Sequence, residues 1–152
     1  MYREIYLTPL LALTHQLFKK INMKSILLIE DNIDILENLA EYLEMEGYLI
    51  YSTNNGNMGI EMALKFMPDL IICDMPRPGI DGYEVLRLLI SNLNITKIPF
   101  IFCTTMSEKI NRSDALESGA DDYIIKPFEL ETVLQMAKFC IKSGSKRQRL
   151  TA

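Results

Sequence analysis

Several absences narrow the function of this chain. It has three cysteines, Cys73, Cys103 and Cys140, but no CxxC spacing, which argues against zinc binding and thioredoxin-like redox chemistry. No hydrophobic run is long enough to cross a bilayer, so we expect no membrane contact. The net charge is −4, whereas non-specific nucleic-acid binding needs a basic surface. Free thiols within apolar segments suit a reducing compartment, and we therefore expect a cytoplasmic protein.

The chain does have enough hydrophobic sequence for one folded domain, which we expect at residues 23–144. Within residues 1–22, Pro9 and His15 break the apolar pattern and argue against a signal peptide. Two interpretations fit this extension: an amphipathic helix that packs on the domain or a partner, or non-native sequence before a start at Met23. We favour the second, because a compact domain begins at Lys24. The end of the chain, with residues 145–152 as a basic tail, is expected to lie in solvent.

Between these ends, short apolar runs alternate with amphipathic segments. The runs lie at residues 25–30, 48–52, 70–74, 98–104 and 123–125, and the amphipathic segments at residues 36–43, 60–67, 81–93, 107–119 and 130–141. This alternation predicts an α/β fold with one doubly wound parallel sheet. Asp81 can cap the first turn of the segment at 81–93. The segment at 107–119, with Ser107 as a possible cap, has the fewest apolar residues. We expect it to be the helix most able to shift.

Polar side chains follow the apolar runs where strands would end. They are Glu30, Asp31, Asp74, Thr104 and Lys126. Strands of a parallel sheet bring their carboxyl ends to one edge, so these side chains should meet there. Clustered acids repel one another, and Mg²⁺ would offset that repulsion. Each residue alone also fits a helix cap, a turn or, for Thr104, an ordinary strand position, but together they suit a site that stabilises a phosphoryl group.

In residue type and position along the chain, this set resembles the receiver domain of two-component response regulators. The matching positions are Glu30–Asp31, Asp74, the loop from Pro78 to Gly82, Thr104, Tyr123 and Lys126–Pro127. The resemblance covers roughly residues 24–144. It implies a flavodoxin-like (βα)5 fold with strand order 2-1-3-4-5.

The resemblance also implies a mechanism. Asp74 would accept a phosphoryl group from a sensor histidine kinase, a phosphotransfer protein or a small phosphodonor. Mg²⁺ would be held by Glu30, Asp31, Asp74 and the backbone carbonyl of Pro76. Lys126 and Thr104 would stabilise the phosphoryl oxygens, and Thr104 and Tyr123 would form the switch. The protein would then be a signalling switch rather than an enzyme, although it assists its own phosphorylation and dephosphorylation.

The expected partners follow from this mechanism. A downstream protein would bind the face made by the segments at 107–119, 123–125 and 130–141. We expect a single-domain regulator without direct nucleic-acid contact, as a monomer or weak homodimer.

Three positions depart from the family pattern. Arg77 stands where an apolar residue is usual, and Thr105, larger than the usual Ala or Gly, could narrow access for the phosphodonor. Pro76 and Met106 are non-acidic and orient water poorly, which predicts slow loss of the phosphoryl group over a time course. Arg77 and Thr105 keep open the alternative of a pseudo-receiver, an interaction module that works without phosphorylation.

Two other phosphate-related folds fit less well. A flavodoxin needs a Ser/Thr/Gly-rich phosphate loop where Glu30 and Asp31 stand, and a haloacid-dehalogenase-type phosphatase needs an acid where Pro76 stands. Cys73 and Cys103 precede Asp74 and Thr104, and alternation predicts both thiols on the face opposite the site residues. We expect buried, inert thiols rather than a redox switch.

Overall fold

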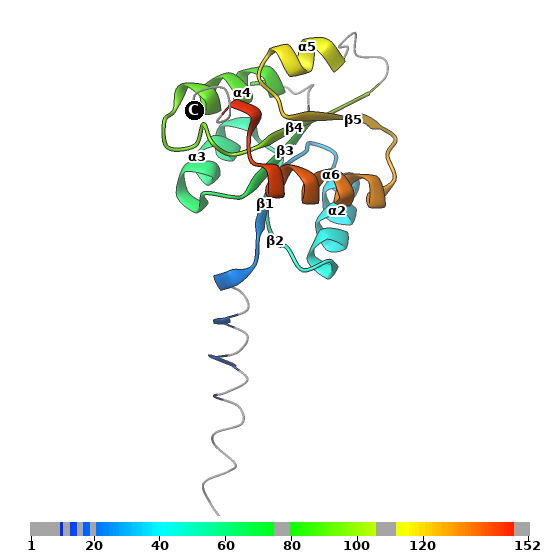
Figure 1. The fold of residues 1–152 in the computed structure, drawn as a ribbon. Coiled ribbons are helices and arrows are strands. Elements are labelled where there is room, and N and C mark those ends of the chain that lie inside the picture. Colours follow the sequence, from blue (N-terminus) through cyan, green and yellow to red (C-terminus); the bar gives the residue numbers. More distant parts are fainter. Residues whose placement is uncertain are drawn as a thin grey trace, which may run out of the picture.

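A parallel sheet forms the centre of the molecule in a computed structural model (Figure 1). The structure describes residues 10, 13–14, 17–18, 21–74, 80–105 and 112–147. The strands are β1 (Ser25–Ile29), β2 (Leu49–Thr53), β3 (Leu70–Asp74), β4 (Phe100–Thr105) and β5 (Asp122–Lys126). They pair in the order β2-β1-β3-β4-β5, which confirms the predicted doubly wound fold.

Helices cover both faces of this sheet (Figure 1). They are α2 (Ile33–Met45), α3 (Gly56–Phe66), α4 (Gly82–Ser91), α5 (Arg112–Glu117) and α6 (Leu130–Ser143). Apolar residues of α2 and α6 pack on one face, and those of α3, α4 and α5 on the other. The inner strands are buried on both faces, which explains why their sequences are continuous apolar runs.

Three of the helices, α2, α3 and α4, begin where short polar side chains cap their first turns. Asn32, Asn55 and Asp81 each accept a hydrogen bond from a backbone N–H within the helix that follows. Asp81 was predicted as an N-cap, and the bond from the Glu84 N–H at 2.9 Å confirms it. Ser107, the predicted cap of the fourth helix, lies outside the described residues.

The register of β3 and β4 corrects the prediction for the thiols. Cys103 is paired with Asp74, and Cys73 is paired with Phe102. Because alternate residues of a strand point to opposite faces, Cys73 packs on the α3–α4 side and Cys103 on the α2–α6 side. The two thiols therefore do not share a face of the sheet.

The prediction of a solvated C-terminal tail is wrong for Ser145 and Arg147, whereas Lys146 between them is exposed. Ser145 is 1% exposed, and the Arg147 side chain is 13% exposed. Both have polar groups hydrogen-bonded to Asp121, the residue that precedes β5. Sequence composition gave no sign of these partners, which lie more than twenty residues earlier in the chain.

The described residues before β1 include helical positions with exposed apolar side chains, namely Leu10, Leu13, Leu17, Phe18 and Ile21. At these positions the extension is thus not packed on the domain. Among the described residues, no helix is long and apolar enough to span a membrane.

Candidate functional site

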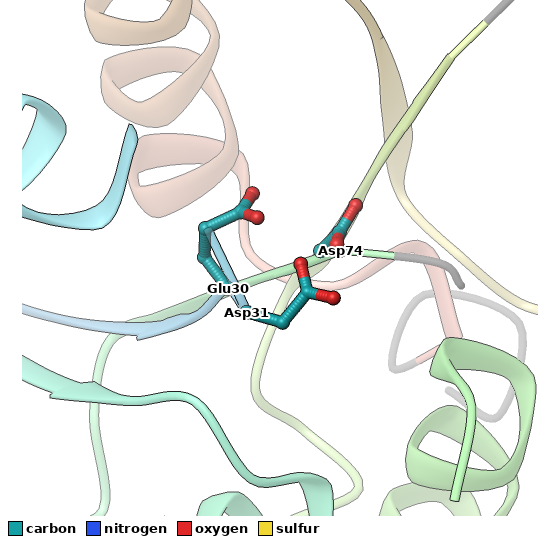
Figure 2. Close-up of side chains that lie close together, drawn as sticks. All are labelled: Glu30, Asp31 and Asp74. Atoms are coloured by element: carbon teal, nitrogen blue, oxygen red, sulfur yellow. The ribbon is translucent and has the colours of Figure 1, made fainter. Parts of the chain in front are cut away.

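Acidic side chains gather where β1 and β3 end (Figure 2). Glu30 and Asp31 directly follow β1, and Asp74 is the last residue of β3. One carboxylate oxygen from each lies within 4.8 Å of the others. The strand ends thus bring the predicted acids together, as the parallel arrangement required.

These acids differ in their access to solvent. Glu30 is 5% exposed and Asp74 is 3% exposed, whereas Asp31 is exposed to solvent. Glu30 is held in place because its Oε1 accepts the backbone N–H of Asn32 at 3.0 Å. This role of Asn32 was not predicted from the sequence, although an Asn just before an amphipathic segment is a typical helix cap.

Lys126, the last residue of β5, bridges the buried acids. Its Nζ lies 2.7 Å from Glu30 Oε2 and 2.9 Å from Asp74 Oδ1, with 13% of the side chain exposed. A nearly buried ammonium between buried carboxylates lowers the cost of burying each of them. The lysine is therefore part of the site and not an exposed turn residue.

The site holds more carboxylates than cations, and this excess affects the pKa values of Asp74 and Lys126. Burial raises the pKa of the Asp74 carboxyl from 3.8 to about 7, and repulsion by Glu30 adds to the shift while Lys126 opposes it. Burial alone would lower the pKa of Lys126, but Glu30 and Asp74 raise it above its ordinary value. Negative charge is thus in excess at the strand ends, and a further cation would be favourable.

The donor set fits Mg²⁺. Hard carboxylate oxygens from Glu30, Asp31 and Asp74 lie close together, and the exposure of Asp31 leaves one side open to solvent. Mg²⁺ prefers oxygen ligands and keeps several waters, so an open site of few carboxylates suits it. The fourth predicted ligand, the carbonyl of Pro76, lies outside the described residues.

The predicted switch residues lie on β4 and β5. Thr104 is fully buried, and its hydroxyl donates to the carbonyl of Thr105 at 3.4 Å, a long hydrogen bond. Thr105 is half-buried and is paired with Lys126 across the strands. Tyr123 is half-buried against the α3–α4 side of the core. Arg77 and Met106 lie outside the described residues.

Comparison with known proteins agrees with this geometry. The model of the response regulator receiver domain matches residues 26–138. The chain belongs to this family. Receiver domains are signalling switches of two-component systems rather than classical enzymes, and Mg²⁺ binding in an acidic site is general among them.

Relatives of two lengths are found among curated proteins. The chain is 35% identical over 131 residues to the transcriptional regulatory protein ResD of Bacillus subtilis, covering 86% of this chain and 53% of ResD. It is 30% identical over 113 residues to protein PilH of Pseudomonas aeruginosa, covering 74% of this chain and 93% of PilH. The chain thus spans about half the length of ResD but most of PilH.

Solved structures share the fold. A putative response regulator from Chloroflexus aurantiacus has a TM-score of 0.75 at 26% identity, covering 80% of this chain and 99% of that one. The receiver domain of sensor histidine kinase PA1611 from Pseudomonas aeruginosa has a TM-score of 0.70 at 27% identity, covering 79% and 98%. That crystal structure has a magnesium ion coordinated in its active site cleft.

Proposed function

We propose that this protein is a phosphoryl-accepting switch in which Asp74 is the acceptor. The observation that carries the proposal is the position of Lys126, whose ammonium contacts both Asp74 and Glu30 beside the acidic cluster. An acceptor carboxylate needs a fixed cation nearby, because phosphoryl transfer spreads negative charge over three oxygens. Lys126 supplies that cation from a neighbouring strand.

The reaction forms a bond between an Asp74 carboxylate oxygen and phosphorus, and breaks the bond from phosphorus to the donor. The donor is a phosphohistidine of a sensor kinase or phosphotransfer protein, or a small acyl phosphate. Lys126 moves from pairing with Asp74 to pairing with the phosphoryl oxygens, and Glu30 keeps the lysine in position. Bound Mg²⁺, held by Glu30, Asp31, Asp74 and the Pro76 carbonyl, would neutralise charge on the transferred group.

Phosphorylation would then shift a conformational equilibrium. The new oxygens accept hydrogen bonds, which favours arrangements that bring the Thr104 hydroxyl closer to Asp74. The group biases the equilibrium only by its differential contacts with the two arrangements. Movement of Thr104 would be followed by Tyr123 on the neighbouring strand and by α5, the least anchored helix.

The output surface would be the face made by α5, β5 and α6. Its exposed apolar side chains include Ile125 on β5 and Phe139 on α6. We propose that a downstream protein binds here and that the signal passes by protein contact, in the cytoplasm, without direct contact to nucleic acid or membrane. The domain begins near Met23, and the free protein is a monomer or weak homodimer.

The test is an intact mass after incubation with acetyl phosphate and Mg²⁺. We expect one added phosphoryl group, which disappears on chelation and in Asp74→Asn. Asp69→Asn is the matched control, because Asp69 precedes the same strand at its opposite end and should leave the adduct unchanged. No adduct with acetyl phosphate or with a phosphotransfer protein would contradict the proposal and favour a pseudo-receiver.

A further inference from the structure

The segment after α6 returns to the edge of the sheet opposite the acidic site. Ser145 and Arg147 lie beside the residues that precede β4 and β5, and Figure 1 shows this red end of the chain beside α4. Ser145 is 1% exposed and the Arg147 side chain 13% exposed. This edge of the sheet takes no part in the proposed phosphoryl chemistry, so the burial of polar groups here needs another explanation.

Asp121 is the acceptor around which this edge is organised. Its side chain is 2% exposed. It accepts the backbone N–H of Phe100 at 2.9 Å, which fixes the start of β4, and the backbone N–H of Lys146 at 2.5 Å. The Ser145 hydroxyl donates to it at 3.3 Å. One buried carboxylate therefore joins the start of a central strand to the end of the chain.

Arg147 completes this arrangement by binding two loops at once. Its guanidinium donates to the carbonyls of Thr96 at 3.2 Å and Ile98 at 2.5 Å, in the loop after α4. It also donates to the carbonyl of Gly119, after α5, and to Asp121 at 3.2 Å. The planar guanidinium presents its donors in a fixed geometry, so these acceptors must keep their relative positions to satisfy it. We call Asp121, Ser145 and Arg147 the clasp.

The clasp holds the carboxyl end of α5. Ala115 is the one fully buried side chain among the described residues of α5, so few buried apolar contacts hold this part of the helix. Gly119 has φ +104°, and a Cβ built there would lie 2.8 Å from Ile90 of α4 and 3.6 Å from the Arg147 side chain. The end of α5 is thus packed between α4 on one side and Arg147 on the other.

We propose that the clasp opposes the movement of α5 that accompanies switching, so that docking of the segment after α6 and phosphorylation of Asp74 are coupled. This inference rests on the proposed function. If α5 moves, the Gly119 carbonyl moves with it, while the Thr96 and Ile98 carbonyls stay with β4. Arg147 then loses a partner inside a nearly buried site, which is unfavourable for a charged group. Arg147 and Asp121 are therefore positioning residues.

The test compares Arg147→Gln with Lys142→Gln, which removes the same charge from an exposed side chain outside the clasp. Acetyl phosphate reacts with the fraction of molecules in the competent arrangement, so loosening the clasp should raise the rate. We expect Arg147→Gln to be phosphorylated about fivefold faster or more, with Lys142→Gln at the wild-type rate. If Arg147→Gln does not fold, Ser145→Ala removes a smaller part of the clasp and should act in the same direction.

Coupling is reciprocal, so phosphorylation of the wild type must also loosen the clasp. Hydrogen exchange at the amides of Phe100 and Lys146, which donate to Asp121, should become faster in the phosphorylated protein. Unchanged exchange at these amides would overturn the inference. So would an Arg147→Gln rate equal to that of Lys142→Gln alongside lower thermal stability, because the clasp would then be merely structural.

A failure of the proposed function is distinguishable from a failure of the clasp. If the wild type takes up no phosphoryl group, the proposed function fails. The hold of the clasp on α5 is then tested by the hydrogen-exchange rates of residues 112–119 in the unphosphorylated variants. Faster exchange in Arg147→Gln than in Lys142→Gln would support its hold on α5, and equal exchange would refute it.

Discussion

Asp74 carries a conflict between stability and function at the scale of a single residue. It is 3% exposed and lies beside Glu30, and burial raises its pKa to about 7. A buried carboxylate costs folding free energy when it is charged, and Lys126 offsets only part of that cost. A carboxylate is nevertheless required at this position to accept a phosphoryl group. The site therefore keeps a residue that destabilises the metal-free protein.

We predict that Asp74→Asn stabilises the metal-free protein near neutral pH by about 1–3 kcal/mol. Between pH 3.8 and about 7 the folded state holds a proton on Asp74 that the unfolded state has released, so wild-type stability falls as pH rises through this window. The variant lacks this contribution. Thermal unfolding of both proteins across this range, without metal, would measure it.

Mg²⁺ provides the control for that experiment. Because a ligand that binds only the folded state stabilises it, Mg²⁺ should raise the unfolding temperature of the wild type more than that of Asp74→Asn. A variant no more stable than the wild type above pH 7 would contradict the prediction.

The cysteine residues show burial acting on a different group. Burial raises the pKa of the Cys103 and Cys140 thiols to about 12. Since the thiolate is the reactive form, these thiols should react with a disulfide reagent far more slowly in the folded protein than in denaturant. At about pH 8, less than about one thousandth of each buried thiol would be in the thiolate form. A rapid reaction of the native protein with a chromogenic disulfide reagent at this pH would therefore contradict the prediction.

At the scale of the element, α5 differs from the other helices. The described helix spans Arg112–Glu117 and buries Ala115, whereas α2 buries Leu36, Leu39 and Leu43. Helices with few buried apolar contacts open at low free-energy cost. The weak anchorage predicted from composition is thus visible in the packing of the described turns, and it makes α5 the element best suited to change position.

We predict that amides of α5 exchange hydrogen at least about tenfold faster than those of α2, because each 1.4 kcal/mol of opening free energy is a factor of ten. Native-state hydrogen exchange with peptide-level mass spectrometry would measure both helices in one experiment. Equal protection would mean that α5 is anchored by more than its described contacts.

At the scale of the whole molecule, the two edges of the sheet have different roles. The carboxyl edge carries the acids and Lys126, and the amino edge carries the clasp of Asp121, Ser145 and Arg147. Ser145 and Arg147, which lie beyond the boundary expected from the sequence at residue 144, are thus packed on the folded unit.

We predict that a chain ending at Gly144 is less stable than the full chain by about 2–4 kcal/mol, because Asp121 is left buried without its cation. A chain ending at Arg147 keeps the clasp and should be within about 0.5 kcal/mol of the full chain. Denaturant unfolding of the three chains would compare them. Equal stability of the two shortened chains would show that the clasp adds nothing to the fold.

The sequence by itself determined the alternation of strands and helices, the cap at Asp81 and the acids at the strand ends. These are local properties, because hydrophobic periodicity and capping depend on residues a few positions apart. The strand order came from resemblance to a family, not from periodicity.

Only the tertiary structure decided which side chains meet across distant strands. Lys126 contacts Glu30 and Asp74, the register of β3 and β4 separates Cys73 from Cys103, and Arg147 is buried against Asp121. The local sequence around a basic residue near a chain end is the same whether the side chain is exposed to solvent or paired with a buried acid. Its partner is chosen by how the sheet brings the strand ends and loops together, and no local pattern encodes that.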